Sequence, residues 1–314
     1  MIPVTSDLFK TEAGLFVQKG NFFLDPQKPV KNAIVSHAHA DHFVLGHGNV
    51  YCTPATYSIL KARYGKKLSG TFFTKDYEEQ FEVGTTKLRF YSAGHMLGSA
   101  QLYFELNGER HLYTGDFKIQ PDVTCSPYTY VEIDTLITES TFANPLINHP
   151  DDVSEIQKIN QFVNQGIIIG TYVLGKAQRL NALLEKYCPE HVVMLYHSIV
   201  PFHKIYDEYG IKINNWIPYS RRILKQHQRC VYLVPPVIFK YYHNQYKVLK
   251  AFASGWDRLH KGNDFSLHIS DHADWAQLLM VIERSKAKRI VTLHGDGSHL
   301  KSYSSDKSFE VIIS

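Results

Sequence analysis

The sequence predicts an α/β protein in which a strand-rich first part is interrupted by an insert of alternating helices and strands. Three observations lead to this prediction. Short apolar segments joined by tight turns fill the first 142 residues, alternation of helix and strand begins near residue 150, and metal-capable side chains occur on both sides of that alternation. The domain boundaries that we expect are 1–142 for the first part, 143–250 for the insert and 251–314 for a return to the first part.

The first part contains short runs of apolar and β-branched residues, which predict strands over 14–25, 32–36, 82–93, 100–115 and 134–140. Asn107 and Gly108 lie between two alternating segments, which is a strong signal for a hairpin. One helix is expected after Thr53 as N-cap, with Pro54 at its first position and Gly65 at its end.

In the insert, helical patterns over 151–166 and 175–187 alternate with strand patterns over 167–173 and 191–196, which favours a mainly parallel sheet. In the return segment the sequence predicts strands over 264–270, 289–294 and 309–314 and a helix over 274–287.

Composition is that of a globular enzyme: 314 residues, 44% hydrophobic and 20% charged. No apolar run reaches the roughly 18 residues needed to span a bilayer, so we expect a cytoplasmic protein without a membrane partner. The four cysteines form no CxxC pair, which argues against a disulfide framework or a thiolate zinc site.

Positive charge is concentrated in the insert. Residues 143–250 hold 13 Lys and Arg against 7 Asp and Glu, a net of +6, whereas residues 1–142 hold 13 against 15, a net of −2. A cationic surface attracts polyanions, so a substrate with a phosphate backbone fits this distribution, although a solvated helical face would also explain it.

The segment Ile34–His42, IVSHAHADH, places three histidines and an aspartate after a short apolar run. Side chains alternate along an extended segment, so His37 and His39 share one side, and the following turn lets Asp41 and His42 approach from another. Imidazole and carboxylate ligands suit zinc, with manganese as the alternative. Four desolvated polar groups in one place are costly without a ligand to offset them.

Further ligands are expected next to glycines at strand ends. His95 lies between Gly94 and Gly98, Asp116 follows Gly115, and His294 precedes Gly295. We therefore predict two divalent ions: one bound by His37, His39 and His95, a second bound by Asp41, His42 and His294, with Asp116 bridging them. Asp25, in FFLDP, is expected to accept a hydrogen bond that steadies the histidine-rich loop; the alternative is a turn residue before Pro26.

These motifs resemble the metal motifs of the metallo-β-lactamase superfamily in order and spacing: SHAHADH, SAGHMLGSA and LYTGDF. The later segments ITESTF, SDHADW and TLHGDG resemble the additional motifs of the β-CASP nucleases, and together with YVLGKAQRL the chain is most similar to bacterial DNA ligase-associated exonucleases. The resemblance spans nearly the whole chain and implies an αββα sandwich with an inserted α/β β-CASP cap domain. By the same resemblance, the cap would cover the site as a lid.

The resemblance also implies the chemistry. Two divalent ions can lower the pKa of a water towards neutrality and hold a phosphate oxygen, and Asp116 would take part by bridging them. His272 would protonate the leaving oxygen, while Glu139 hydrogen-bonds its other ring nitrogen. A capping role for Asp271 or Asp274 beside His272 is the alternative structural reading.

The insert offers candidates for substrate binding. Gly175, Lys176 and Gln178 stand where a strand leads into a helix, and a helix N-terminus with a lysine binds phosphate well. Basic residues and tyrosines are also interleaved between residues 221 and 250. They could bind single-stranded nucleic acid by stacking on its bases, or they could simply pack within the insert. The residues are Arg221, Arg222, Lys225, Arg229, Tyr232, Lys240, Tyr241, Tyr242, Tyr246, Lys247 and Lys250.

The leading hypothesis is a two-metal phosphodiester hydrolase: a nuclease that acts on DNA as an exonuclease in repair, in association with a DNA ligase and a helicase. The alternative is an RNA-processing β-CASP ribonuclease similar to mRNA 3′-end processing factors. A catalytically inactive binding subunit and a hydrolase of small lactams or thioesters fit less well, because every expected metal ligand is present and the insert is cationic.

Overall fold

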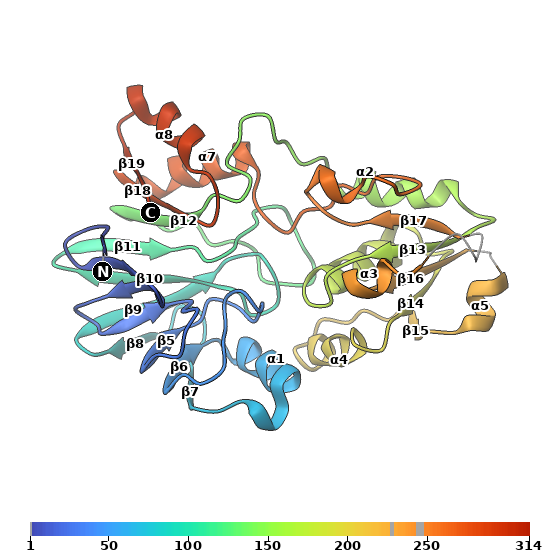
Figure 1. Ribbon diagram of the computed structural model, residues 1–314, viewed down its shortest axis with the longest axis horizontal. Helices are drawn as coiled ribbons and strands as arrows, with labels where there is room; N and C mark the ends of the chain where they lie inside the picture. The colour runs from blue at the N-terminus through green and yellow to red at the C-terminus, as the bar shows by residue number, and fades with distance from the viewer. Residues whose placement is uncertain (1, 227–228, 243–247) are drawn as a thin grey trace. The chain divides into compact units, whose positions relative to one another are not determined.

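The computed structural model describes residues 2–226, 229–242 and 248–314, and it divides into two compact units (Figure 1). The first unit contains Met1–Pro121, Cys125–Asn148 and His272–Ser314. The second contains Asp122–Thr124 and His149–Asp271. The α/β class predicted from the sequence is confirmed.

Two sheets form the centre of the first unit. The first sheet is antiparallel from β1 to β4 and parallel from β4 to β7. Its order is β1 (Ile2–Pro3), β2 (Leu8–Thr11), β3 (Gly14–Val17), β4 (Phe22–Leu24), β5 (Asn32–Ile34), β6 (Asn49–Cys52) and β7 (Thr71–Thr74).

The second sheet joins strands from before and after the insert. Its order is β19 (Glu310–Ile313), β18 (Arg289–Leu293), β12 (Thr135–Glu139), β11 (Glu109–Tyr113), β10 (Ala100–Leu106), β9 (Thr86–Ser92) and β8 (Gln80–Val83). Strands β11, β12, β18 and β19 run parallel, so their carboxyl ends meet at one edge of the sheet. Strand β18, which follows the second unit in the sequence, pairs with β12, which precedes it.

Apolar side chains fill the space between the two sheets and cover their outer faces. Phe22, Leu24 and Ile34 of the first sheet join Leu102 and Phe104 of the second in one buried cluster. Helices α7 (Trp275–Ser285) and α8 (Ser298–Tyr303), followed by η5 (Ser304–Asp306), pack on the other face of the second sheet. With α1 on the first sheet, the layers form the expected αββα sandwich (Figure 1).

Helix α1 (Pro54–Tyr64) and η1 (Gly65–Lys67) follow the start and stop signals in the sequence. The Thr53 hydroxyl accepts a hydrogen bond from the Thr56 amide at 3.2 Å, and Gly65 ends the helix with φ 53°. Both threonine hydroxyls also donate to the Gly98 carbonyl, at 2.7 and 3.0 Å. This cap therefore anchors the loop that carries His95.

The second unit is a three-layer α/β structure around a parallel sheet, ordered β15 (Trp216–Pro218), β14 (Val192–Leu195), β16 (Cys230–Val234), β13 (Gly166–Gly170) and β17 (Leu249–Phe252). Side chains of β13 alternate between two buried clusters, with Ile167 and Ile169 in one and Ile168 in the other. The helices are α2 (Asp152–Gln157), η2 (Lys158–Gln161), α3 (Lys176–Tyr187), α4 (Val200–Glu208), α5 (Arg221–Gln226), α6 (Pro236–Phe239) and η4 (Asp257–Leu259).

Two details differ from the sequence-based expectation. The insert was expected to end at residue 250, but β17 pairs with β13 and the second unit continues to Asp271. The segment 264–270 was expected to be a strand, but only Leu267 pairs, through an isolated bridge to Ala253. Its backbone is held instead by scattered contacts, such as the bond from the His268 amide to Glu155 at 2.8 Å.

The close approach of Gly98 to α1 predicts the effect of a small substitution. Gly98 has φ 79°, and a Cβ atom there would lie 2.8 Å from Thr53 Oγ1 and from the Thr56 amide nitrogen. We expect Gly98→Ala to lower the free energy of unfolding by about 1–3 kcal/mol more than Gly108→Ala. Gly108 has φ 84° but open space around it, so it isolates the backbone cost. Equal losses in denaturant titrations of the two variants would contradict the crowding argument.

Candidate metal centre

The histidine-rich loop follows β5 at one edge of the first sheet. The Val35 amide continues the sheet by donating to the Tyr51 carbonyl at 2.9 Å, and the Ser36 carbonyl accepts from the Ala100 amide of the second sheet at 2.8 Å. A turn closed by the bond from the His42 amide to the His39 carbonyl then reverses the chain. The loop is thus tied to both sheets before its ligands begin.

The remaining candidates come from the edge where the parallel strands of the second sheet end. Asp116 follows β11, and Glu139 is the last residue of β12. Glu139 pairs in register with Leu293, so His294 comes directly after that position. His95 lies in the loop after β9, and its amide donates to the Ser99 hydroxyl at 3.1 Å. Residues far apart in the sequence therefore meet at one edge of the sandwich.

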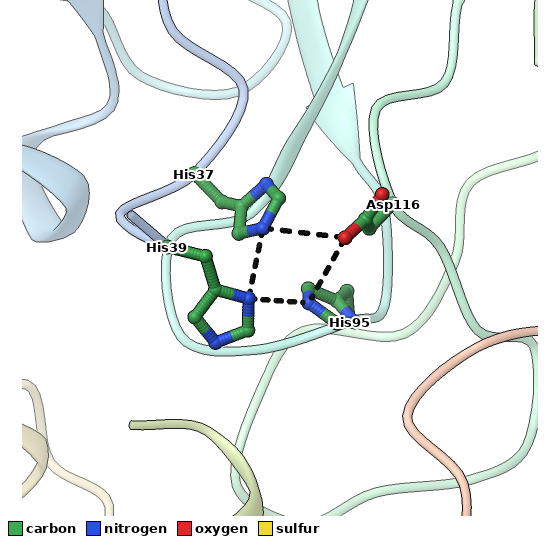
Figure 2. A group of neighbouring side chains, drawn as sticks. All are labelled: His37, His39, His95 and Asp116. Carbon is green, nitrogen blue, oxygen red and sulfur yellow. Dashed lines mark hydrogen bonds and ion pairs between the residues drawn. The ribbon is translucent and has the colours of Figure 1, made fainter. Parts of the chain in front are cut away.

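Three imidazoles and a carboxylate converge in the first ligand group, shown in Figure 2. His37 Nε2 lies 3.0 Å from His39 Nδ1, which lies 3.2 Å from His95 Nε2. Asp116 Oδ2 lies 3.6 Å from His37 Nε2 and 4.0 Å from His95 Nε2. These four residues include three of the predicted ligands and the predicted bridge.

The four ligand atoms fit a divalent metal ion. Ligands about 2.1 Å from a tetrahedral zinc lie about 3.4 Å from one another, close to the separations between these nitrogens and the Asp116 oxygen. His37, His95 and Asp116 are buried, so water offers little competition for the site. Three imidazoles with one carboxylate are a donor set suited to zinc.

The protonation states of His37 and Asp116 in the first ligand group also suit a metal. Burial lowers the pKa of His37 well below its usual value, and the neighbouring His42 lowers it further. Burial by itself would raise the pKa of Asp116, but His42 and His272 outweigh it and hold that pKa well below its usual value. At neutral pH the His37 ring is neutral and Asp116 is ionised, as metal ligation requires.

Asp25 accepts hydrogen bonds from several groups behind the ligands. Its Oδ1 accepts from the Ser36 amide at 2.7 Å, and its Oδ2 accepts from the Ser36 hydroxyl at 2.5 Å and from the Tyr113 hydroxyl at 2.7 Å. His42 Nδ1 lies 2.7 Å from the same Oδ2. These are the contacts needed for the supporting role predicted for Asp25, since they orient the His42 ring with Nε2 3.3 Å from Asp116.

The second predicted ligand group is only partly assembled. The His42 and His294 rings have centroids 5.4 Å apart, and His42 reaches Asp116. The Asp41 side chain is exposed, and its carbonyl accepts a bond from Gln27. In residues 2–226, 229–242 and 248–314, the groups of three or more ligand atoms within 4.8 Å of one another include neither Asp41 nor His294. The second metal group remains a prediction.

His272 and Glu139 form a contact beside the first ligand group. His272 Nδ1 lies 2.7 Å from Glu139 Oε2, and His272 Nε2 lies 4.0 Å from Asp116 Oδ2. The Glu139 carboxylate also accepts bonds from the Phe117 amide at 2.8 Å and the Thr141 hydroxyl at 2.6 Å. The carboxylate is therefore fixed, and it orients the imidazole so that Nε2 faces the ligand group.

The structure does not support the phosphate-binding role predicted for Gly175, Lys176 and Gln178. Lys176 is buried, with Nζ donating to the Ile269 carbonyl at 2.8 Å and paired with Asp271 at 3.4 Å. The Gly175 amide donates to Gln178 Oε1 at 2.8 Å. The Lys176 charge and the Gly175 amide therefore have partners within the second unit. The local sequence pattern could not reveal these partners, because two of them are distant in the sequence.

The basic and aromatic segment is divided between core and surface. Tyr232 is buried and stacks on Tyr219 with centroids 4.5 Å apart, which favours ordinary packing for this ring. Tyr241 is exposed, and Lys250 Nζ lies over the Phe239 ring at 4.7 Å. Tyr246 and Lys247 lie outside the described residues, as does the side chain of Lys225.

Sequence reasoning missed Ser36 and Tyr113 as part of the centre. A serine directly before the first ligand histidine carries no distinctive signal. Tyr113 is the last residue of β11 and follows the apolar Leu112, so it is expected to be buried. A buried tyrosine hydroxyl needs a hydrogen-bond partner, but only the fold reveals that this partner is Asp25.

Comparison with known proteins agrees with this geometry. The family model described as a Zn-dependent metallo-hydrolase RNA specificity domain matches residues 264–311. A protein of Opitutus terrae named "Probable DNA ligase" is 28% identical to this chain, with 91% of the chain and 29% of that protein aligned. An "RNase J-like protein" of Methanocaldococcus jannaschii is 30% identical over 56% of this chain and 48% of its own length.

These similarities support a metallo-β-lactamase fold of the β-CASP type for this chain. The description of the family model and the name of the second relative agree with the predicted enzyme class, a metal-dependent hydrolase of the nuclease kind. The chain spans less than half the length of either relative. A solved structure from Enterococcus faecalis, titled as a protein of unknown function, shares the fold with a TM-score of 0.61 and 15% identity, covering 90% of this chain and 79% of its own.

In the described part of this chain, the helices are too short or too polar to cross a lipid bilayer.

The first ligand group predicts the effect of removing one imidazole. We expect His39→Ala to bind metal at least tenfold more weakly than the wild type, because the Nδ1 donor between His37 and His95 is lost. Metal content after dialysis against a buffered zinc solution measures this. The control is His299→Ala, an exposed histidine of α8. Equal zinc retention in both variants would exclude His39 as a ligand.

The Asp25 contacts predict a smaller effect for Tyr113→Phe. The hydroxyl is one of several donors to Asp25, so its loss should cost about 1–2 kcal/mol of unfolding free energy. Zinc affinity should fall less than in Asp25→Ala, which leaves Ser36 and His42 without their acceptor. Calorimetric zinc titration of both variants gives the comparison. Stronger zinc loss in Tyr113→Phe than in Asp25→Ala would contradict this order.

Proposed function

We propose that this chain is a metal-dependent nuclease that hydrolyses phosphodiester bonds of DNA. The observation that carries the proposal is the position of the His272–Glu139 pair beside a complete group of metal ligands. Such a group can activate water and bind a phosphate oxygen, and a histidine next to it can serve the leaving oxygen.

The residues that would hold the metal are His37, His39, His95 and Asp116 for a first ion. Asp41, His42 and His294, with Asp116 shared, would hold a second. When bound, such ions lower the pKa of a water to about 7 and neutralise charge on the phosphoryl group. Zinc is the first choice because of the imidazole-rich donor set, and manganese is the alternative.

The protein's own groups account for the proton transfer. His272 holds its Nδ1 proton towards Glu139 and, when protonated, presents a second proton at Nε2. Glu139 favours this cationic form and prevents the ring from turning. Loss of the Nε2 proton to the leaving oxygen neutralises the developing alkoxide.

DNA is favoured as the substrate because the relative with 91% of this chain aligned is named a probable DNA ligase. Exonucleolytic trimming in repair, in cooperation with a ligase and a helicase, would fit an enzyme that prepares ends for joining. The cytoplasmic location expected from the sequence stays part of this proposal.

RNA is the second candidate substrate. Two observations favour it: the description of the matched family model includes RNA specificity, and one relative is named RNase J-like. The same chemistry serves both backbones, because the reacting phosphodiester is identical. The difference would come from contacts to the 2′-hydroxyl, which no metal ligand provides.

A degradation assay tests the activity and the substrate together. Zinc- or manganese-loaded protein is incubated with matched DNA and RNA oligonucleotides labelled at the 5′ or the 3′ end, in single- and double-stranded form. We expect faster hydrolysis of DNA and stepwise shortening from one end. His272→Ala should lower kcat by about 10²–10⁴-fold while it keeps its metal. Faster RNA cleavage would favour the second candidate, and no cleavage of either polymer would refute the proposed activity.

A further inference from the structure

Positive charge in the first unit is concentrated where α1 ends and η1 follows. The cations of this segment, which we call the basic end of α1, are Lys61, Arg63, Lys66 and Lys67. Residues 53–74 contain no Asp or Glu. Without the basic end, residues 1–142 hold 9 Lys and Arg against 15 Asp and Glu. A low net charge over the whole first part therefore hides a strongly cationic segment.

The three lysines of the basic end are exposed, and their charges are not neutralised by carboxylates. Within residues 2–226, 229–242 and 248–314, none of the three forms an ion pair. Other surface cations of the first unit do, such as Lys28 with Glu12 at 2.7 Å. Seven helical residues span about 10 Å, close to the Debye length of about 8–10 Å in physiological salt. The fields of the four cations therefore add.

The last turn of α1 packs on the histidine-rich loop within the first unit. Arg63 Nη1 donates to the Ala38 carbonyl at 3.1 Å, and Ala38 stands between two of the predicted metal ligands. The Tyr64 ring lies 5.6 Å, centroid to centroid, from the ring of Phe43, which follows a third predicted ligand. These contacts place the start of the basic end beside the ligand group.

We propose that the basic end of α1 binds the phosphate backbone of the nucleic-acid substrate next to the phosphodiester that is cleaved. The inference rests on the proposed nuclease function and deepens it by assigning a binding surface in the first unit. Guanidinium and ammonium groups form charge-assisted hydrogen bonds with phosphate oxygens. Because such contacts do not read the bases, they hold any sequence in place for hydrolysis.

A simpler explanation is that the lysines only stabilise the carboxyl end of α1, which carries a partial negative charge. This effect is confined to the last turn of a helix, and Lys66 and Lys67 lie beyond Tyr64, the last residue of α1. It therefore accounts for Lys61 better than for the other two lysines. The two explanations predict different measurements.

The test measures binding of a fluorescently labelled single-stranded DNA oligonucleotide at several salt concentrations. The background is metal-loaded His272→Ala protein, whose slow hydrolysis leaves the oligonucleotide intact during the titration. The variant combines Lys61→Gln, Lys66→Gln and Lys67→Gln, and it keeps Arg63 because that residue also holds the Ala38 carbonyl. We expect Kd to rise about 10- to 100-fold near 0.1 M salt. The slope of log Kd against log salt concentration should fall by about 2, or about 0.7 for each lost phosphate contact.

The matched control combines Lys19→Gln, Lys87→Gln and Lys288→Gln, which removes the same charge from exposed positions of the first unit. These lysines lie before or near the starts of β4, β9 and β18, whose other ends lead to Asp25 and to the loops of predicted ligands. They are therefore at the far edge of the sheets from the ligand group. We expect Kd within about threefold of the background and an unchanged salt slope.

Two results would overturn the inference while leaving the nuclease proposal intact. One is a lower Tm of the basic-end variant with unchanged DNA affinity, which is the outcome expected if the lysines only stabilise the helix. The other is an equal loss of affinity in the basic-end variant and the control, which would show an effect of net charge alone. If the triple variant fails to fold, Lys66→Gln with Lys67→Gln, outside α1, should still lower the slope by about 1.4.

The nuclease proposal is tested separately, by hydrolysis with the wild-type protein. A wild type that binds DNA through the basic end but cleaves neither DNA nor RNA would refute the nuclease proposal, since binding and hydrolysis are measured independently. A wild type that cleaves DNA, with a salt slope that the basic-end variant does not change, would refute only this inference.

Discussion

The Asp116 carboxylate is the group around which the centre is built. Its Oδ2 lies 3.3 Å from His42, 3.6 Å from His37 and 4.0 Å from both His95 and His272. One buried negative charge thus faces four imidazoles from three parts of the chain. Without it, the rings would crowd together with no charge to balance a shared proton or metal. The second sheet positions this carboxylate, because parallel pairing makes β11 end at the same edge as β12 and β18.

Support behind Asp116 follows a common pattern in which one carboxylate fixes one imidazole. Asp25 holds His42, and Glu139 holds His272. In both cases the carboxylate is buried and accepts further bonds from backbone amides, from Ser36 and Phe117 respectively. Each acceptor holds its ring with the other nitrogen, Nε2, directed towards Asp116. In the proposed enzyme the first ring would bind metal and the second would transfer a proton, with the same construction.

Much of this arrangement could be predicted from local patterns. The spacing of His37 and His39, and the glycines beside His95, predicted residues that do meet in one ligand group, since alternation and turn chemistry are local properties. Local patterns failed for Lys176. A lysine after a glycine at a helix start looks free for phosphate, yet its charge is paired with Asp271, 95 positions along the chain. The boundary of the insert was mispredicted for the same reason, because β17 belongs to the second unit through its pairing with the distant strand β13.

The second unit is not one continuous stretch of sequence, because it takes Asp122–Thr124 as well as His149–Asp271. Recombination or engineering that exchanged only the longer stretch for its counterpart in a relative would leave Asp122 behind. Arg179, which contacts Asp122, would then meet whatever residue the recipient carries at that place. A second unit transplanted between related proteins must therefore include residues 122–124, which are encoded apart from the rest, and this limits how modular the architecture is in practice.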